Sequence, residues 1–126
     1  MCFSCSIISS VLISLNNLPD CYSHLSLVGV ACSVGEQPIK GLISSGAQAR
    51  MTVAEALANL ALAQISRLED VKASCNWMWA AKLPEEGAKM YEVCEALCQA
   101  LRRLGPAIDG GKDSLSMAAK AICSSS

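Results

Sequence analysis

The sequence predicts an α+β domain in which helices pack on an incomplete sheet. Three observations lead to this prediction: a helical pattern of apolar residues after residue 50, an alternating segment at 70–79, and a second helical pattern at 85–104. Helices and strands that follow one another in this order are typical of α+β units. The two strands predicted in this region are too few to complete a sheet by themselves.

The first helix is predicted from a capping box, in which Thr52 is followed three residues later by Glu55. Glu55 and Asn59 are one turn apart and so lie on the same helix face. A carboxylate and an amide oxygen at this spacing can ligate Mg²⁺, which accepts few protein oxygens and keeps water or phosphate as other ligands. On spacing alone, a helix cap and an exposed asparagine are the simpler interpretation. The predicted apolar face comprises Val53, Leu57, Leu60, Ala61 and Ile65.

Residues 70–79 alternate in polarity, which predicts a half-buried strand. Its apolar face consists of Val71, Ala73, Cys75, Trp77 and Trp79. A second helix is predicted to begin at 84–86, where a proline and two acids favour a helix start, and to end before Gly105-Pro106. Arg102 and Arg103 suit the negative end of its dipole. Its predicted apolar stripe runs through Tyr91, Cys94, Leu97, Cys98, Leu101 and Leu104.

A short strand at 107–109 is predicted to lead into a glycine-containing loop that is a candidate for phosphate binding. The loop lacks the P-loop pattern, because an aspartate rather than Ser or Thr follows its lysine. A plain tight turn would use the same glycines equally well. The candidate residues are Gly110, Gly111, Lys112, Asp113 and Ser114.

Composition limits the classes of protein that the chain can belong to. Its 126 residues suffice for one domain. A net charge of −1 excludes the basic surface expected of a nucleic-acid binder or a polybasic membrane-surface protein. No apolar run approaches the roughly 18 residues of a membrane span. Residues 1–39 contain no Lys or Arg, so they fit neither a secretory nor a mitochondrial leader, and we expect a cytoplasmic location.

The eight cysteines form no standard site. Cys2 and Cys5 make a single CxxC pair, and Cys21 and Cys32 complete no zinc spacing. A catalytic cysteine needs a general base, and His24 is the only histidine in the sequence. Structural zinc and cysteine catalysis are therefore both disfavoured, and free thiols are expected.

Four blocks of sequence resemble the large, glutamine-dependent phosphoribosylformylglycinamidine synthases, in the order and spacing of that family and with most likeness to its eukaryotic members. The blocks are GEQPIKGL at 35–42, ARMTVAEALANL at 49–60, residues 70–74 with 76–83, and DGGKDSLSM at 109–117. The resemblance covers residues 29–121. It implies a partial PurM-like N-terminal subdomain with an incomplete mixed sheet, taken from the second of the two PurM-like halves of the enzyme.

The resemblance also implies a function. The family uses ATP and glutamine to convert formylglycinamide ribonucleotide to formylglycinamidine ribonucleotide in purine synthesis. The matching half holds an auxiliary nucleotide, ATP or ADP, with Mg²⁺, so no catalytic residue is expected here. Family metal ligands include a Glu and an Asn four residues later, which match Glu55 and Asn59. The implied partners are the other PurM-like half, the glutaminase domain and a small-molecule nucleotide.

Some residues depart from the family pattern. Residues 1–28 and 122–126 match nothing in the family, and we interpret the first segment as disordered or as a wrongly predicted gene start. Ser44-Ser45-Gly46 stands where Asp-Pro-Lys is frequent, and Cys75 where Gly is common. We therefore expect a fragment of the synthase that is inactive alone. The alternative is a truncated, non-catalytic product that acts as a nucleotide-binding or interaction module.

Overall fold

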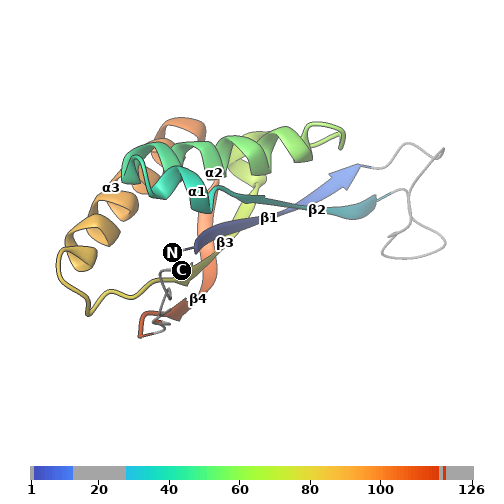
Figure 1. Cartoon of the computed structure of the whole chain (residues 1–126). Coiled ribbons are helices and arrows are strands. Elements are labelled where there is room, and N and C mark those ends of the chain that lie inside the picture. The colour runs from blue at the N-terminus through green and yellow to red at the C-terminus, as the bar shows by residue number, and fades with distance from the viewer. Residues whose placement is uncertain (1, 13–27, 117, 119–126) are drawn as a thin grey trace, which may run out of the picture.

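The computed structural model describes residues 2–12, 28–116 and 118. Within these ranges a sheet carries two long helices on one face, and the α+β class is confirmed (Figure 1). A 3₁₀ turn at Leu68–Asp70 precedes the third strand. The elements are β1 (Cys2–Leu12), β2 (Val28–Glu36), α1 (Pro38–Gly41), α2 (Ser45–Leu60), β3 (Lys72–Met78), α3 (Glu86–Leu104) and β4 (Ala107–Ser114).

The sheet has the order β2-β1-β3-β4. β1 is antiparallel to both of its neighbours, whereas β3 and β4 are parallel, with Lys72 opposite Ala107 and Met78 opposite Ser114. The sheet is therefore mixed, as the resemblance implied. Sequence analysis assigned no element to residues 2–12, yet these form an inner strand. Cys21, His24 and the tail 122–126 lie outside the described residues.

Helix α2 begins earlier than predicted, so the capping box at Thr52 is wrong. Ser44 is the N-cap, and its Oγ accepts a hydrogen bond of 3.3 Å from the backbone nitrogen of Ala47. Thr52 lies inside the helix with no exposed surface. The first turns bury Ser45 and Gln48, which are small or polar, so hydrophobic periodicity does not reveal them. The helix also ends at Leu60, before the predicted apolar positions Ala61 and Ile65.

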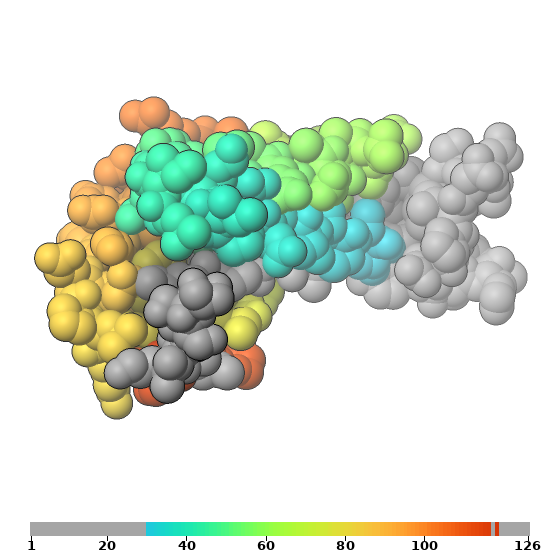
Figure 2. Space-filling model, in the orientation of Figure 1, coloured from blue at the N-terminus to red at the C-terminus, as the bar shows by residue number. Residues whose placement is uncertain are grey.

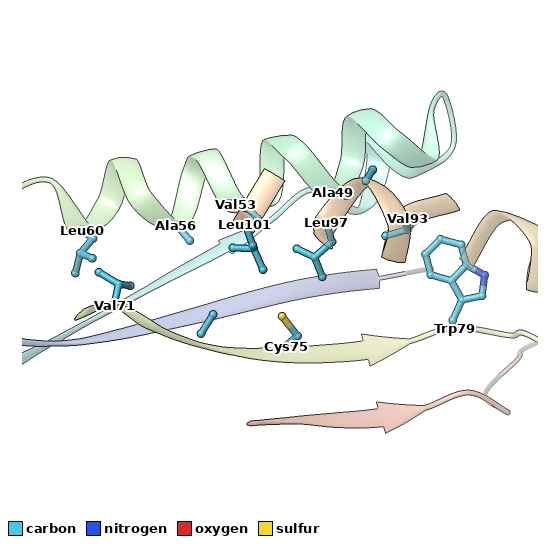
Figure 3. Close-up of a cluster of buried hydrophobic side chains, with 12 residues drawn as sticks. Ala49, Val53, Ala56, Leu60, Val71, Cys75, Trp79, Val93, Leu97 and Leu101 are labelled. Atoms are coloured by element: carbon cyan, nitrogen blue, oxygen red, sulfur yellow. The ribbon is translucent and has the colours of Figure 1, made fainter. Parts of the chain in front are cut away.

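The core lies between the sheet and the helices α2 and α3 (Figure 3). β3 alternates as predicted, with Ala73 and Cys75 buried and Lys72 exposed. The largest core side chain is Trp79, which is 2% exposed. The helices contribute Ala49, Val53, Ala56, Leu60, Val93, Ala96, Leu97 and Leu101 to this core.

Helix α3 spans the predicted range, but its buried face is rotated from the predicted stripe. Leu97 and Leu101 are buried as predicted. Tyr91 is 70% exposed, Cys94 is also exposed, and Leu104 is 38% exposed, so these three assignments are wrong. The buried face instead includes Val93 and Ala96, because α3 packs against α2 as well as the sheet. Within the described ranges no helix is long and apolar enough to cross a membrane.

The two ends of α3 are fixed by local contacts. At its start, Trp79 Nε1 donates hydrogen bonds to the backbone oxygen of Glu86, at 3.0 Å, and to its Oε2, at 3.1 Å. Lys89 Nζ pairs with Glu86 Oε1 at 2.9 Å, so the charge of this nearly buried carboxylate has both an ion-pair partner and hydrogen bonds. At the other end, Gly105 adopts a left-handed φ of 102°, and its N–H bonds to the carbonyl of Leu101, which confirms the predicted stop.

Candidate functional site

The two candidate metal ligands lie side by side on α2, where the helix meets the carboxyl end of β2. Glu55 Oε2 accepts hydrogen bonds from the backbone nitrogen of Glu36, at 2.8 Å, and from Gln37 Nε2, at 2.9 Å. Asn59 Nδ2 donates to the carbonyl oxygen of Val34, also at 2.9 Å. In Figure 2, β2 (cyan) lies directly against α2 (green). The structure therefore brings both predicted residues to one strand end.

Close contact between β2 and α2 makes these bonds possible. A Cβ atom on Gly35 would lie 2.1 Å from the carbonyl oxygen of Thr52 and 2.6 Å from the backbone nitrogen of Ala56, so only glycine fits. Two residues before Gly35, Ser33 Oγ donates a hydrogen bond of 2.7 Å to the carbonyl oxygen of Ala56. Strand and helix thus touch through their backbones, which places the end of β2 within reach of Glu55.

The bonds to Glu55 also set its charge state. The hydrogen bond from Gln37, followed by that from the Glu36 N–H, stabilises the ionised carboxylate and holds the pKa of Glu55 below its ordinary value of 4.5. A carboxyl group whose folded pKa lies below its unfolded pKa binds fewer protons in the native state. Its contribution to stability is therefore present above the unfolded pKa and is lost as the pH falls through the folded pKa.

We expect Glu55→Gln to weaken the dependence of stability on pH. The wild-type melting temperature should fall as the pH is lowered from 7 to below 4.5, and the variant should lose less over the same interval. Part of the dependence will remain, since Arg67 and Ser66 also lower the pKa of Asp70. Thermal melts at a series of pH values measure this. Glu95→Gln, on the exposed side of α3, is the matched control, and identical slopes for Glu55→Gln and wild type would contradict the prediction.

The oxygen donors at this site fit part of a Mg²⁺ coordination sphere. No hydrogen bond from a described residue reaches Glu55 Oε1 or Asn59 Oδ1. These are hard oxygen donors, one charged and one neutral, of the kind that Mg²⁺ accepts in an octahedral shell. Among the residues that the structure describes, no group of three or more His, Cys, Asp or Glu side chains could hold a metal ion. Water, phosphate or groups beyond these residues would have to complete the shell.

The second candidate group, residues 110–114, does not form the predicted loop. All five residues belong to β4 and pair with β3. A Cβ on Gly111 would lie 2.5 Å from the carbonyl oxygen of Cys75, so this glycine serves strand packing. Lys112 is exposed, and its Nζ donates to Ser114 Oγ at 2.6 Å. Because β4 and β2 are opposite edges of the sheet, the structure does not bring this group together with Glu55 and Asn59.

Sequence reasoning missed Gln37. The residue lies in the GEQPIKGL block that carries part of the family resemblance, but nothing in that block shows which residue it contacts. Its contact with Glu55 joins residues that are 18 positions apart. Such a contact follows only from the way β2 packs along α2.

Comparisons with known proteins agree on one family. The family described as the FGAR-AT PurM_N-like domain matches residues 13–124. The phosphoribosylformylglycinamidine synthases of Drosophila melanogaster and Homo sapiens are 64% and 56% identical to this chain over 98 residues, which is 78% of the chain and 7% of each relative. A probable chloroplastic or mitochondrial synthase of Arabidopsis thaliana is 61% identical over 95 residues, or 75% of the chain and 7% of that protein. No solved structure matches.

The chain thus spans about 7% of the length of the curated relatives it matches. The family match begins at residue 13 and ends at residue 124. It therefore includes parts of the segments 1–28 and 122–126, for which no resemblance to the family was predicted. The match agrees with the mixed α+β architecture, and it confirms the family resemblance that the four sequence blocks indicated. The chain therefore belongs to the family of the FGAR-AT PurM_N-like domain.

Proposed function

We propose that this chain is part of a phosphoribosylformylglycinamidine synthase, an ATP- and glutamine-dependent ligase of purine synthesis, and contributes to the half that holds an auxiliary nucleotide with Mg²⁺. The observation that carries the proposal is the arrangement of Glu55 and Asn59, whose carboxylate and amide are both tied to the end of β2. Relatives of up to 64% identity that bear the synthase name support it.

The roles that we propose for Glu55 and Asn59 follow from their hydrogen bonds to β2. Glu55 offers an ionised oxygen and Asn59 a neutral one, and β2 holds both side chains in place. Mg²⁺, when bound, would offset the negative charge of nucleotide phosphate. Lys112 is exposed and positively charged and remains a candidate phosphate contact, but at a separate place, because β4 is the edge of the sheet opposite β2. We expect the glycines beside it to act in strand packing.

We further propose that the other PurM-like half and the glutaminase domain are required for turnover, so that the isolated chain is inactive. The small share of the relatives' length that the chain covers supports this. Exposed apolar residues on and after α1 also favour a surface for contact with the remaining domains, since soluble proteins rarely leave such residues clustered in water. These are Ile39, Leu42 and Ile43, which are 72%, 76% and 82% exposed.

A chimaera tests the proposal. In the Drosophila synthase, the segment that matches this chain is replaced by the corresponding residues of this chain, and the nucleotide and Mg²⁺ retained after purification are measured. We expect Glu55→Gln to weaken nucleotide retention at least tenfold, equivalent to about 1.4 kcal/mol, because the site loses its charged ligand. Glutaminase activity should not change. Glu95→Gln, on the exposed side of α3, is the control.

The isolated 126-residue chain is assayed beside the chimaera with ATP, glutamine and formylglycinamide ribonucleotide, and should form no product. Positioning of phosphate and delivery of ammonia need groups from the rest of the synthase. Chain-dependent turnover would overturn the requirement for the other domains. Unchanged nucleotide retention in the Glu55→Gln chimaera would overturn the metal-site assignment and leave Glu55 with the role of fastening β2 to α2.

A further inference from the structure

We propose that Gln37 is the positioning residue of the cation site formed by Glu55 and Asn59. The inference rests on the proposed function, since it takes these two residues as Mg²⁺ ligands. Gln37 would not itself touch the cation. It acts through Glu55, whose carboxylate it holds in one orientation by the 2.9 Å hydrogen bond from its Nε2.

The distribution of hydrogen bonds over the Glu55 carboxylate supports this role. Both donors, the Glu36 backbone nitrogen and Gln37 Nε2, bond to the same oxygen, Oε2. With two donors on one oxygen, rotation of the carboxylate would break both bonds, so the carboxylate is held through Oε2 and neither donor occupies Oε1. A carboxylate held in this way can present Oε1 to a cation without reorganising. Hydrogen bonds to a ligand's remote atom are the usual means by which proteins orient metal ligands.

Asn59 is held by the same strand and in a matching way. Its Nδ2 donates to the carbonyl oxygen of Val34, which fixes the planar amide through its nitrogen and leaves Oδ1, its acceptor, outside this bond. Three groups in a run of four residues, 34–37, thus fix the two candidate ligands. Two of them are backbone groups, which any residue would supply. Gln37 is the member of the run whose contribution depends on its side chain.

The local structure shows that the Gln37 side chain has no capping function. Gln37 occupies the N-cap position of α1, where a polar side chain normally bonds to the exposed N–H groups of the helix. Here it makes no such bond, and its amide bonds to Glu55 across an interval of 18 residues. Its side chain therefore serves the Glu55 carboxylate rather than its own helix.

The test uses the 126-residue chain with Mn²⁺ alone, a paramagnetic cation that shares the preference of Mg²⁺ for oxygen ligands. Broadening of backbone amide resonances near Glu55 and Asn59 reports binding, and competition by Mg²⁺ confirms the site. With two protein ligands, wild-type binding should have a Kd of about 1 mM or weaker. Gln37→Met keeps the size of the side chain but removes the donor, and should weaken binding about tenfold. Gln99→Met, exposed on α3, is the control.

A double-variant cycle separates positioning from a general structural effect. Glu55→Gln should weaken Mn²⁺ binding strongly, and adding Gln37→Met to it should weaken binding no further, because Gln37 acts through Glu55. The same spectra show whether each variant is folded. Wild-type affinity in Gln37→Met, or additive losses in the double variant, would overturn the role of Gln37 alone. Wild-type affinity in Glu55→Gln would overturn the metal site and this inference with it.

Discussion

Replacing Leu97 by alanine should lower the free energy of unfolding by about 2–5 kcal/mol. Leu97 is 1% exposed and lies on the face of α3 that packs toward β3 and α2 (Figure 3). The substitution removes three side-chain carbons and leaves a cavity that backbone elements on either side cannot close. Chemical denaturation of the 126-residue chain, followed by circular dichroism, measures the change.

Tyr91→Ala is the matched control, because it lies on the same helix but is 70% exposed. Its effect should stay within about 0.5 kcal/mol, as for most surface substitutions. The comparison decides between the two alternative orientations of α3. Equal losses for Leu97→Ala and Tyr91→Ala would restore the stripe predicted from the sequence, and a negligible loss for Leu97→Ala would show that α3 does not pack on this core.

The orientation of α3 could be predicted only in part, for a physical reason. Leucines at helical spacing identify a helix and place Leu97 and Leu101 correctly. The other buried positions are Val93 and Ala96, whereas Tyr91, whose ring carries more apolar surface than alanine, is exposed. A prediction from apolar side chains alone therefore places Tyr91 on the buried face and leaves out Ala96. The contact with α2 decides the matter, because a small residue is needed where two helices pack closely.

The missed elements show two different limits. Residues 2–12 carry the alternating pattern of a strand, in which Phe3, Cys5 and Ile7 alternate with Ser4 and Ser6. The interpretation of this segment as disordered or as a wrongly predicted gene start was therefore wrong for these residues. The start of α2 carries almost no such pattern. Its first turns face the protein interior with serine, glutamine and alanine, and only the bond from Ala47 to Ser44 defines the N-cap. Here tertiary packing overrides what hydrophobic periodicity can predict.

The same distinction applies to the candidate site. Helical spacing alone places Glu55 and Asn59 on one face, and the structure agrees. Their contacts with Val34, Glu36 and Gln37 could not be predicted, because they depend on which strand lies beside α2 and in what register. The prediction of a loop at Gly110 and Gly111 was wrong for a related reason. Glycine is needed where backbones approach closely, and the sequence does not say whether the neighbour is a phosphate or another strand.

The close approach of β2 to α2 leads to the second large effect. Gly35→Ala should destabilise the chain by at least the upper end of the roughly 1–3 kcal/mol typical of overpacking. The new Cβ would meet the Thr52 carbonyl oxygen at 2.1 Å and the Ala56 nitrogen at 2.6 Å. Both are backbone atoms of a helix interior, so neither can move aside as a flexible side chain would. The strand has to shift away from the helix.

That shift should also disturb the candidate site, because Glu36 follows Gly35 directly and donates its backbone N–H to Glu55. We therefore expect Gly35→Ala both to lower the unfolding midpoint and to reduce the Mn²⁺-induced broadening near Glu55. Gly110→Ala is the matched control: it too lies in a strand, but its Cβ would meet only Ser74 Oγ, at an ordinary 3.6 Å. If the two alanine variants were equally stable, β2 and α2 could not be in the backbone contact on which the Glu55 and Asn59 arrangement depends.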